Sequence, residues 1–391
     1  MDYDSLLNPL IREIKPSGIR RFFDIAAEMD NVISLSVGEP DFKTPWHVRE
    51  EGITTLQKGK TRYSPNSGFT DLLCEISNYY DRRFGLKYEP KGEIIVTVGG
   101  SEAIDLCVRS LVSEGDEVLI PEPCFVCYSP ITEMARGVPV PIVTRVEDNF
   151  RLTAEQLRAA ITPRTKLLIL PFPNNPTGAV MRREHLEEIA EVLRGTNIMI
   201  LSDEIYSELT YDDQRHVSIA SIDGMKERTI VVNGFSKSFS MTGWRLGYAM
   251  GPAPVIKQMT KLHQYAIMCA PSTAQYAAIE ALRNGDEDIE AMRTEYDMRR
   301  RYIVDGFRSM GFECFMPEGA FYIFPCIKNT GLTSDEFCEQ LIMSKRVAVV
   351  PGSAFGESGE GYIRVSYSYS VKHISEALRR IREFCEERGL I

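Results

Sequence analysis

The segment Lys166-Leu167-Leu168-Ile169-Leu170-Pro171 is a short, continuously apolar run that ends at a proline. Similar runs follow at residues 198–201 and 230–232, and a helical pattern over Arg183–Leu193 separates the first two. A strand that is apolar on both faces is typical of a parallel sheet with helices on both sides. These runs therefore predict the core of an α/β fold.

Short strands and helices alternate outward from this core, from about residue 68 to residue 250. The other expected strands are residues 93–98, 117–120 and Val138–Val143, and the other expected helices include Thr70–Phe84 and 101–112. In sheets of this kind, ligands bind beyond the carboxyl ends of the strands. The residues that follow each strand are therefore the first candidates for a functional site.

The two ends of the chain indicate a second, smaller domain. Residues 271–301 are expected to be helical and to lead into it. The elements expected there are strands at 319–324, 347–350 and 363–365 and a helix at 372–388. At the other end of the chain, an irregular arm is expected to contain one short helix, capped by Ser17 and running through Ile19, Phe22, Phe23 and Ala26. The predicted division is residues 1–45 as the arm and part of the small domain, 46–285 as the large domain and 286–391 as the rest of the small domain.

The composition is ordinary for a globular protein that dissolves in water. Of its 391 residues, 43% are hydrophobic and 26% are charged, and the net charge of −10 argues against nucleic acid as the main partner. The nine cysteines are scattered, and the pair Cys124 and Cys127 has no second pair at zinc spacing, so no metal site is expected. No apolar stretch approaches the ~18 residues of a membrane span, and the first residues lack the features of a secretory signal. We expect a cytoplasmic location.

A lysine lies shortly after the apolar run 230–232, in the string Ser236-Lys237-Ser238. A lysine that emerges from a buried strand can be desolvated, which lowers its pKa and favours imine formation with an aldehyde. Arg245 follows in the same loop, and its planar guanidinium suits a phosphate. An amine that traps a carbonyl beside a cation that holds a phosphate indicates pyridoxal 5'-phosphate. A Ser-Lys pair alone is most often part of a surface loop, so the inference depends on the motifs below.

Polar residues follow two more of the strands. Asp203 lies in the string Ser202-Asp203-Glu204, which follows the run 198–201. A buried carboxylate there is costly unless it is paired, for which a pyridinium nitrogen is suitable. Tyr206 and Asn175, the latter in an Asn-Asn-Pro-Thr-Gly string, are candidate donors to a phenolate-like ring oxygen. The alternatives are a helix-capping aspartate, a surface tyrosine and an ordinary proline turn.

Three further segments add to the pattern. The string Gly99-Gly100-Ser101 joins a strand to a helix, and it is either a phosphate-binding turn or a plain turn in which Ser101 caps the helix. Phe125 is placed to stack on a pyridine ring or to pack in the core. Arg364 alternates with apolar residues on a strand, where it either grips a carboxylate through two bonds or is exposed.

In this order, the motifs resemble those of the class I and II aminotransferases of the aspartate aminotransferase superfamily, pyridoxal-phosphate fold type I. The resemblance runs from Ser36-Val37-Gly38-Glu39-Pro40-Asp41-Phe42 to Arg364, and it is greatest with bacterial and archaeal aspartate and aromatic aminotransferases because of Ser17-Gly18-Ile19-Arg20, Met241-Thr242-Gly243-Trp244-Arg245 and His263-Gln264-Tyr265. It implies a large domain that binds the cofactor on a mostly parallel seven-stranded sheet between helices, a smaller α+β domain, and a homodimer with shared active sites. The implied reaction moves an amino group from an L-amino acid to a 2-oxo acid, with 2-oxoglutarate as the expected acceptor.

The resemblance also implies roles for individual residues. Lys237, Asp203 and Tyr206 would be catalytic: Lys237 would form the aldimine, Asp203 would face the ring nitrogen, and Tyr206 would contact the ring oxygen with Asn175. The residues expected to hold the rest of the cofactor are Gly100, Ser101, Glu102 (through its backbone), Ser236 and Arg245 at the phosphate, Phe125 on the ring, and Tyr63 from the neighbouring subunit. The residues expected to bind substrate are Gly38, Asn175 and Arg364 at the α-carboxylate and Ile19 near the side chain.

Two positions depart from the pattern of some relatives. Position 234 is glycine where some have a second phosphate-binding serine, and position 101 is serine where some aspartate-using relatives have a lysine, which argues against a substrate range limited to dicarboxylates. Aspartate, aromatic amino acids, alanine and an acylated diamino acid all stay open as donors. The alternative functions are a C–S β-lyase or related eliminating enzyme and, disfavoured by the acidic charge, a regulator that binds pyridoxal phosphate.

Overall fold

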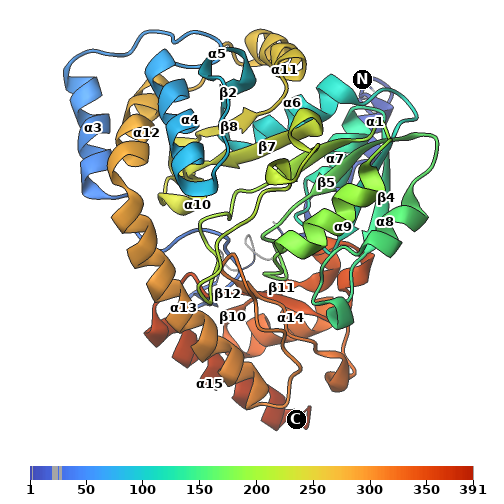
Figure 1. Ribbon diagram of the computed structural model, residues 1–391. Coiled ribbons are helices and arrows are strands. Elements are labelled where there is room, and N and C mark those ends of the chain that lie inside the picture. Colours follow the sequence, from blue (N-terminus) through green and yellow to red (C-terminus); the bar gives the residue numbers. More distant parts are fainter. Residues whose placement is uncertain (2, 20–24, 26–28, 391) are drawn as a thin grey trace.

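A seven-stranded sheet with helices on both faces forms the larger part of the protein, and a smaller part lies beneath it (Figure 1). The computed structural model describes residues 1, 3–19, 25 and 29–390. In spatial order the strands are β2 (Ile94–Thr97), β8 (Gly247–Met250), β7 (Thr229–Gly234), β6 (Met199–Asp203), β5 (Thr165–Leu170), β3 (Glu117–Glu122) and β4 (Val138–Val143). Only β8 runs antiparallel to its neighbours within this sheet, so the predicted mostly parallel sheet is confirmed.

Alternate side chains of each central strand supply cores on opposite faces of the sheet. On β5, Leu167 and Ile169 belong to one cluster, whereas Leu168 and Leu170 belong to another. The helices that cover these faces are α6 (Gly99–Leu111), α7 (Tyr128–Met134) and α11 (Ala253–Ala266) on one side, and α4 (Thr70–Phe84), α8 (Ala154–Ala160), α9 (Arg183–Leu193) and α12 (Ser272–Asn284) on the other. The helix α3 (Trp46–Gln57) packs on α12. Burial of both strand faces explains why these strands are continuously apolar.

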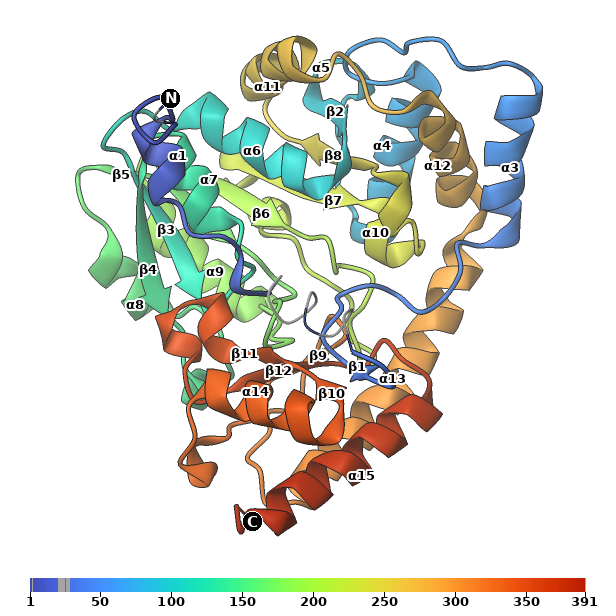
Figure 2. The same cartoon turned by 180° about the vertical axis from the view of Figure 1, so that it is seen from behind.

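The smaller part combines the C-terminal segment with a strand from near the N-terminus. Its strands are β11 (Val350–Pro351), β12 (Ile363–Ser366) and β9 (Tyr322–Ile323) in one antiparallel sheet and the parallel pair β1 (Ile33–Ser34) and β10 (Val347–Ala348). Its helices are α13 (Asp286–Arg308), α14 (Ser334–Lys345) and α15 (Val371–Glu387), and Figure 2 shows α13 and α15 side by side along one edge. The domain boundaries given above stay a prediction.

Four expected elements differ from the structure or lie outside it. Residues 271–301 are not one helix, because the backbone at Gly285 leaves the helical region between α12 and α13. The strand expected at 319–324 shrinks to β9, since Ala320 has a left-handed φ of 57°. The run 347–350 divides between β10 and β11, which belong to different sheets. The helix expected through Ile19, Phe22, Phe23 and Ala26 falls mostly on residues that are not described.

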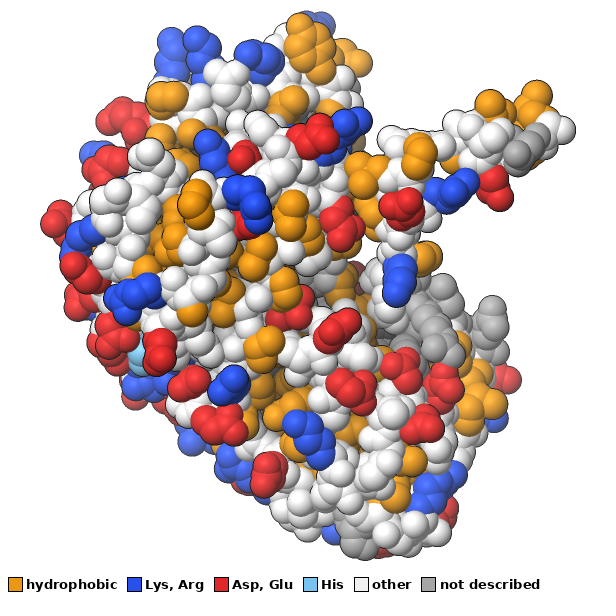
Figure 3. Space-filling model, turned by 90° about the vertical axis from the view of Figure 1, so that its right-hand side faces the viewer, with side chains coloured by type: hydrophobic (Ala, Val, Ile, Leu, Met, Phe, Trp, Pro, Cys, Tyr) orange, Lys and Arg blue, Asp and Glu red, His pale blue; other side chains and the backbone are white. Residues whose placement is uncertain are grey.

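The N-terminal arm stands away from the body of the molecule (Figure 3). It carries the short helix α1 (Pro9–Glu13), which has no buried residue. Leu6, Leu7 and Ile11 are all more than half exposed. Two other short helices, α5 (Pro90–Glu93) and α10 (Phe235–Ser238), adjoin β2 and β7. In the described part of the chain, no helix combines the length and the apolar character needed to cross a membrane.

Candidate active site

A cavity of about 340 Å³ opens beyond the carboxyl ends of β5, β6 and β7. Residues from the smaller part complete its wall. The predicted residues that line it are Ile19, Gly38, Gly100, Ser101, Phe125, Asn175, Asp203, Tyr206, Ser236, Lys237, Arg245 and Arg364. Glu102 and Tyr63 are the two predicted residues outside this lining. The motifs that are far apart in the sequence therefore meet where the sheet topology places them.

Lys237 lies on α10, directly after β7. Its Nζ donates a hydrogen bond of 2.6 Å to the carbonyl oxygen of Gly38. Burial lowers the pKa of Lys237 from 10.5 to about 8, and the positive charges of Arg364 and Arg245 add to the effect. A fall of this size makes the neutral amine about 300-fold more abundant near pH 7. The site therefore holds an amine prepared for nucleophilic chemistry.

Asp203 is the last residue of β6 and is buried. The Tyr128 hydroxyl donates to its Oδ2 at 2.8 Å, and the Ile205 N–H donates to its Oδ1 at 3.2 Å. Burial raises the pKa of Asp203 to about 6, and the two donors partly oppose the rise. A cation placed against this carboxylate would relieve the cost of its burial.

Arg364 lies on β12 and is 2% exposed. Its Nη1 donates to Asn175 Oδ1 at 3.0 Å and its Nη2 to the Ser36 carbonyl oxygen at 2.5 Å. Its Nε is buried and has no hydrogen-bond partner among the residues that the structure describes. Burial lowers the pKa of Arg364. Because its hydrogen-bond partners are neutral, the guanidinium is suited to hold an anionic ligand.

A second group of donors suited to an anion lies at the start of α6. The helix begins at Gly99 with Val98 as its N-cap, so Ser101 is not the cap, and Gly100 and Ser101 lie in the first turn, where N–H groups have no intrahelical acceptor. Arg245 has a left-handed φ of 54°, and its guanidinium lies against Gly99, where a Cβ would stand 2.7 Å from Nη2. Free N–H groups and a guanidinium together fit a phosphate.

The side chains of Glu102 and Tyr63 point to other surroundings. Glu102 Oε2 accepts from the Val98 N–H at 2.5 Å, and Oε1 lies 2.7 Å from Nδ1 of the buried His263. The Glu102 carboxylate is thus engaged, which agrees with a role limited to its backbone. Tyr63 is 77% exposed. Its contact with a neighbouring subunit stays a prediction.

Sequence reasoning missed two tyrosines of the cavity, Tyr128 and Tyr322. Tyr128 holds Asp203, and the Tyr322 hydroxyl lies 2.8 Å from that of Tyr206. Tyr128 could have been predicted from the sequence, because it lies in the same string as Phe125. Nothing in the sequence marked Tyr322 as a site residue, since an aromatic residue on an apolar strand is expected to pack in the hydrophobic core.

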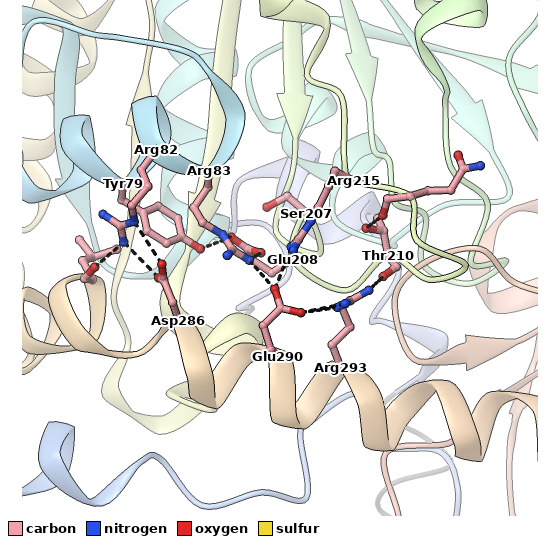
Figure 4. Close-up of polar contacts among 12 residues, drawn as sticks. Tyr79, Arg82, Arg83, Ser207, Glu208, Thr210, Arg215, Asp286, Glu290 and Arg293 are labelled. Carbon is pink, nitrogen blue, oxygen red and sulfur yellow. Dashed lines mark hydrogen bonds and ion pairs between the residues drawn. The ribbon is translucent and has the colours of Figure 1, made fainter.

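A buried ion-pair network holds the loop behind Tyr206 (Figure 4). Glu208 accepts from Arg83 Nε at 2.9 Å and from the Tyr79 hydroxyl, and both donors lie on α4. Arg83 also reaches Glu290 on α13 at 3.1 Å. The side chains of Glu208 and Arg83 are only 2% and 12% exposed. The network therefore ties this loop to both helices.

The cavity fits pyridoxal 5'-phosphate, the cofactor that the resemblance implies. An amine of lowered pKa suits its aldehyde, and the buried carboxylate of Asp203 suits its ring nitrogen. The guanidinium of Arg245 against the bare backbone of Gly99 suits its phosphate. The Nε of Arg364, which has no partner among the described residues, is a donor that suits a carboxylate.

Comparisons with known proteins agree with this assignment. The sequence profile of the family described as "Aminotransferase class I and II" matches residues 30–381. A putative aminotransferase of Bacillus subtilis, YugH, is 51% identical over 97% of this chain and 98% of its own length. An aspartate aminotransferase of Pyrococcus abyssi is 46% identical over 96% of this chain and 97% of its own.

Solved structures show the same likeness. The aromatic aminotransferase of Pyrococcus horikoshii OT3 superimposes with a TM-score of 0.91 at 44% identity, covering 95% of this chain and 100% of that one. The Thermus thermophilus aspartate aminotransferase with maleate gives 0.92 at 36% identity, covering 97% and 99%. The predicted fold type I is therefore confirmed.

Proposed function

The chain belongs to the class I and II aminotransferases and is a pyridoxal-phosphate-dependent enzyme, and on this premise we propose that Lys237 carries the amino-group transfer. The observation that supports this most is the buried amine of lowered pKa, which shares one cavity with Asp203 and two arginines. The substrates of the family are amino acids and 2-oxo acids. We propose 2-oxoglutarate as the acceptor by analogy.

When bound, pyridoxal phosphate supplies an aldehyde that exchanges amines and a ring that withdraws electrons from the substrate α-carbon. In our proposal the Asp203 carboxylate keeps the ring nitrogen protonated through an ion pair. Tyr206 and Asn175 would donate to the ring oxygen. Since Asn175 Oδ1 already accepts from Arg364, its Nδ2 is the atom available to donate. Phe125, which lines the cavity, would stack on the ring.

The two anion sites orient the substrate and the cofactor in this proposal. The phosphate would be held by Gly100, Ser101, Ser236 and Arg245, with the backbone of Glu102. The substrate α-carboxylate would be held by Arg364 and Asn175 beside the backbone of Gly38, with Ile19 near the substrate side chain. Fixing both ends leaves the α-carbon little freedom, which is how positioning accelerates a reaction of this kind.

Lys237 is also the group that we expect to move the proton. Its amine would take the α-proton from the substrate and deliver it to the carbon that carried the aldehyde group of the cofactor. A pKa of about 8 suits this task, because both forms of the amine are then accessible near neutral pH.

We further propose a broad donor range that includes aromatic amino acids. Apolar side chains make up much of the cavity lining, including Ile19, Val37, Ile104 and Phe125. Similar proteins are named for both aspartate and aromatic amino acids. Of the described residues that line the cavity, the cationic ones are Lys237, Arg245 and Arg364, and each already has a proposed task.

A panel of single amino donors tests this proposal. The cofactor-loaded protein is mixed with each donor without an acceptor, and conversion of the bound cofactor is followed by its absorbance. We expect conversion with aromatic donors at rates comparable to aspartate, formation of glutamate once 2-oxoglutarate is added, and no conversion in Lys237→Ala. Conversion by dicarboxylates alone would contradict the donor range, and release of ammonia without an acceptor would indicate elimination.

We propose that the protein is a homodimer in which Tyr63 reaches the phosphate bound by the neighbouring subunit. Tyr63 is exposed, and so are Tyr265 in the last turn of α11 and Met268 just after that helix. Asn66 Nδ2 donates to the Met268 carbonyl oxygen at 2.9 Å, so the two segments that carry these exposed side chains meet at the surface. Such a surface and the exposed arm favour an interface. A cytoplasmic location stays a prediction.

The dimer is tested by light scattering and by cofactor affinity together. The measured mass should be about twice the 44.2 kDa of one chain. Tyr63→Phe should leave the mass unchanged and weaken cofactor binding about 5-fold through the loss of one hydrogen bond. A monomer that retains full cofactor affinity would exclude the shared site.

A further inference from the structure

Tyr322 lines the cavity, but no task has been assigned to it. It lies on β9 in the smaller part, is 1% exposed, and its hydroxyl lies 2.8 Å from the hydroxyl of Tyr206. The guanidinium of Arg364 lies over its ring, 4.5 Å from the centroid. The hydroxyl also faces Gly38, where a Cβ would stand only 2.3 Å from it. One buried tyrosine therefore touches three residues with proposed roles.

The direction of the hydrogen bond between the two tyrosines follows from proton counting. Each phenol has one proton to donate. If Tyr206 donates its proton to the ring oxygen of the cofactor, its own oxygen is left as the acceptor for the Tyr322 hydroxyl. The result is a chain of two hydrogen bonds that runs from Tyr322 through Tyr206 to the ring oxygen.

We propose that Tyr322 is a positioning residue that sets the direction and strength of the hydrogen bond from Tyr206 to the cofactor. Bonds in such a chain polarise one another, so a donor behind Tyr206 makes Tyr206 a stronger donor. This inference rests on the ring-oxygen role proposed for Tyr206. It gives the smaller part of the protein a direct influence on the electronic state of the cofactor.

The surroundings of Tyr322 suit it to this task. The Tyr206 ring packs edge to face against Phe321 at 5.4 Å and against Tyr322 at 5.9 Å. Only a glycine at position 38 leaves space for the Tyr322 hydroxyl, because a Cβ at that position would collide with it. The hydroxyl is thus held in one place before the cofactor binds, so little conformational entropy is lost when the chain of bonds forms.

The test uses the cofactor-loaded protein and the variant Tyr322→Phe, which removes the hydroxyl and keeps the ring beneath Arg364. The readout is a pH titration of the absorbance of the bound cofactor. A donor to the ring oxygen stabilises the more anionic form, so its weakening should raise the apparent pKa of the transition by about 0.3 to 1 unit. Cofactor affinity, measured by equilibrium dialysis, should fall about 2- to 5-fold.

Two further variants separate a positioning role from a structural one. Tyr367→Phe is the matched control, because this buried hydroxyl donates to the Ala320 carbonyl at 3.0 Å in the same part of the fold and lies outside the cavity lining. It should leave the titration unchanged. In a Tyr206→Phe background, Tyr322→Phe should add no further shift, since the chain is already broken.

Each outcome decides the question. A shift in Tyr322→Phe that disappears in the Tyr206→Phe background supports the proposal. An unshifted titration in Tyr322→Phe, a shift equal to that of Tyr367→Phe, or an undiminished shift in the double variant overturns it. A wild-type protein that shows no absorbance from bound cofactor would instead overturn the proposed function, and this inference with it.

Discussion

Replacing Asp203 by Asn should stabilise the cofactor-free protein at neutral pH. Burial raises the pKa of Asp203 from 3.8 to about 6 in the folded protein. The folded state therefore binds this proton more tightly than the unfolded state does. The contribution of this proton binding to the free energy of unfolding is fully present below about pH 4 and is lost as the pH rises through about 6. A rise of about 2 units corresponds to about 3 kcal/mol in total, of which about 2 kcal/mol falls between pH 4.5 and pH 8.

The variant Asp203→Asn is neutral at every pH and has nearly the same shape. Its carbonyl can still accept from Tyr128, while the bond from the Ile205 N–H is lost at a cost of about 1 kcal/mol. That cost does not depend on pH. The free energy of unfolding of the variant relative to wild type should therefore rise by about 2 kcal/mol between pH 4.5 and pH 8. For a chain of this length, this corresponds to about 2 to 3 °C in Tm.

Differential scanning calorimetry of both proteins without cofactor, at several pH values, measures this change. In the same scans with saturating pyridoxal phosphate, wild type should have the higher Tm of the two proteins. The reason is that its Asp203 carboxylate gains an ion pair with the ring nitrogen, so that cofactor binding stabilises wild type more than the variant. If the Tm difference between the two cofactor-free proteins does not change with pH, Asp203 has no raised pKa and the reasoning fails.

Three further predictions concern the network and the site. Glu208→Gln should lower the free energy of unfolding in urea by about 2 kcal/mol, because the buried Arg83 loses its nearer carboxylate partner and keeps only Glu290, whereas Glu383→Gln in an exposed pair on α15 should cost less than about 0.5 kcal/mol. Equal losses would contradict this. Arg364→Lys should raise KM for the amino donor about 10- to 100-fold with a smaller change in kcat, because an ammonium group cannot donate two parallel hydrogen bonds to a carboxylate. An unchanged KM in steady-state kinetics would exclude binding of the substrate carboxylate by Arg364. The rate at which the cofactor-free protein binds pyridoxal phosphate covalently should rise with pH and level off above about pH 8, because the Lys237 amine loses its proton over this range. A rate that does not depend on pH would contradict the lowered pKa of Lys237.

Much of the fold and the site was predictable from the sequence because the information was local. The apolar runs that became β5, β6 and β7 are buried on both faces, so their composition alone indicated parallel strands. Since these strands are parallel, the residues that follow them meet at one edge of the sheet. The order of the residues along the chain was therefore enough to place Asp203 and Lys237 in one site.

What the sequence did not reveal depends on contacts between distant segments. The strand β8 has only four residues and follows the site loop, so nothing marked it as the antiparallel strand between β2 and β7. Tyr322 lies 116 positions from Tyr206, and its role follows only from the 2.8 Å between the two hydroxyls. The exposed Tyr63 has a place in the site only if a second chain is present.

The central claim is that the Lys237 amine is the group that binds the cofactor covalently. The most direct test is reduction of the cofactor-loaded protein with borohydride, followed by peptide mapping by mass spectrometry. We expect the reduced cofactor on the peptide that contains Lys237 and on no other peptide, with loss of the label in Lys237→Ala. A label on a different lysine, or a protein that takes up no label, would contradict the account.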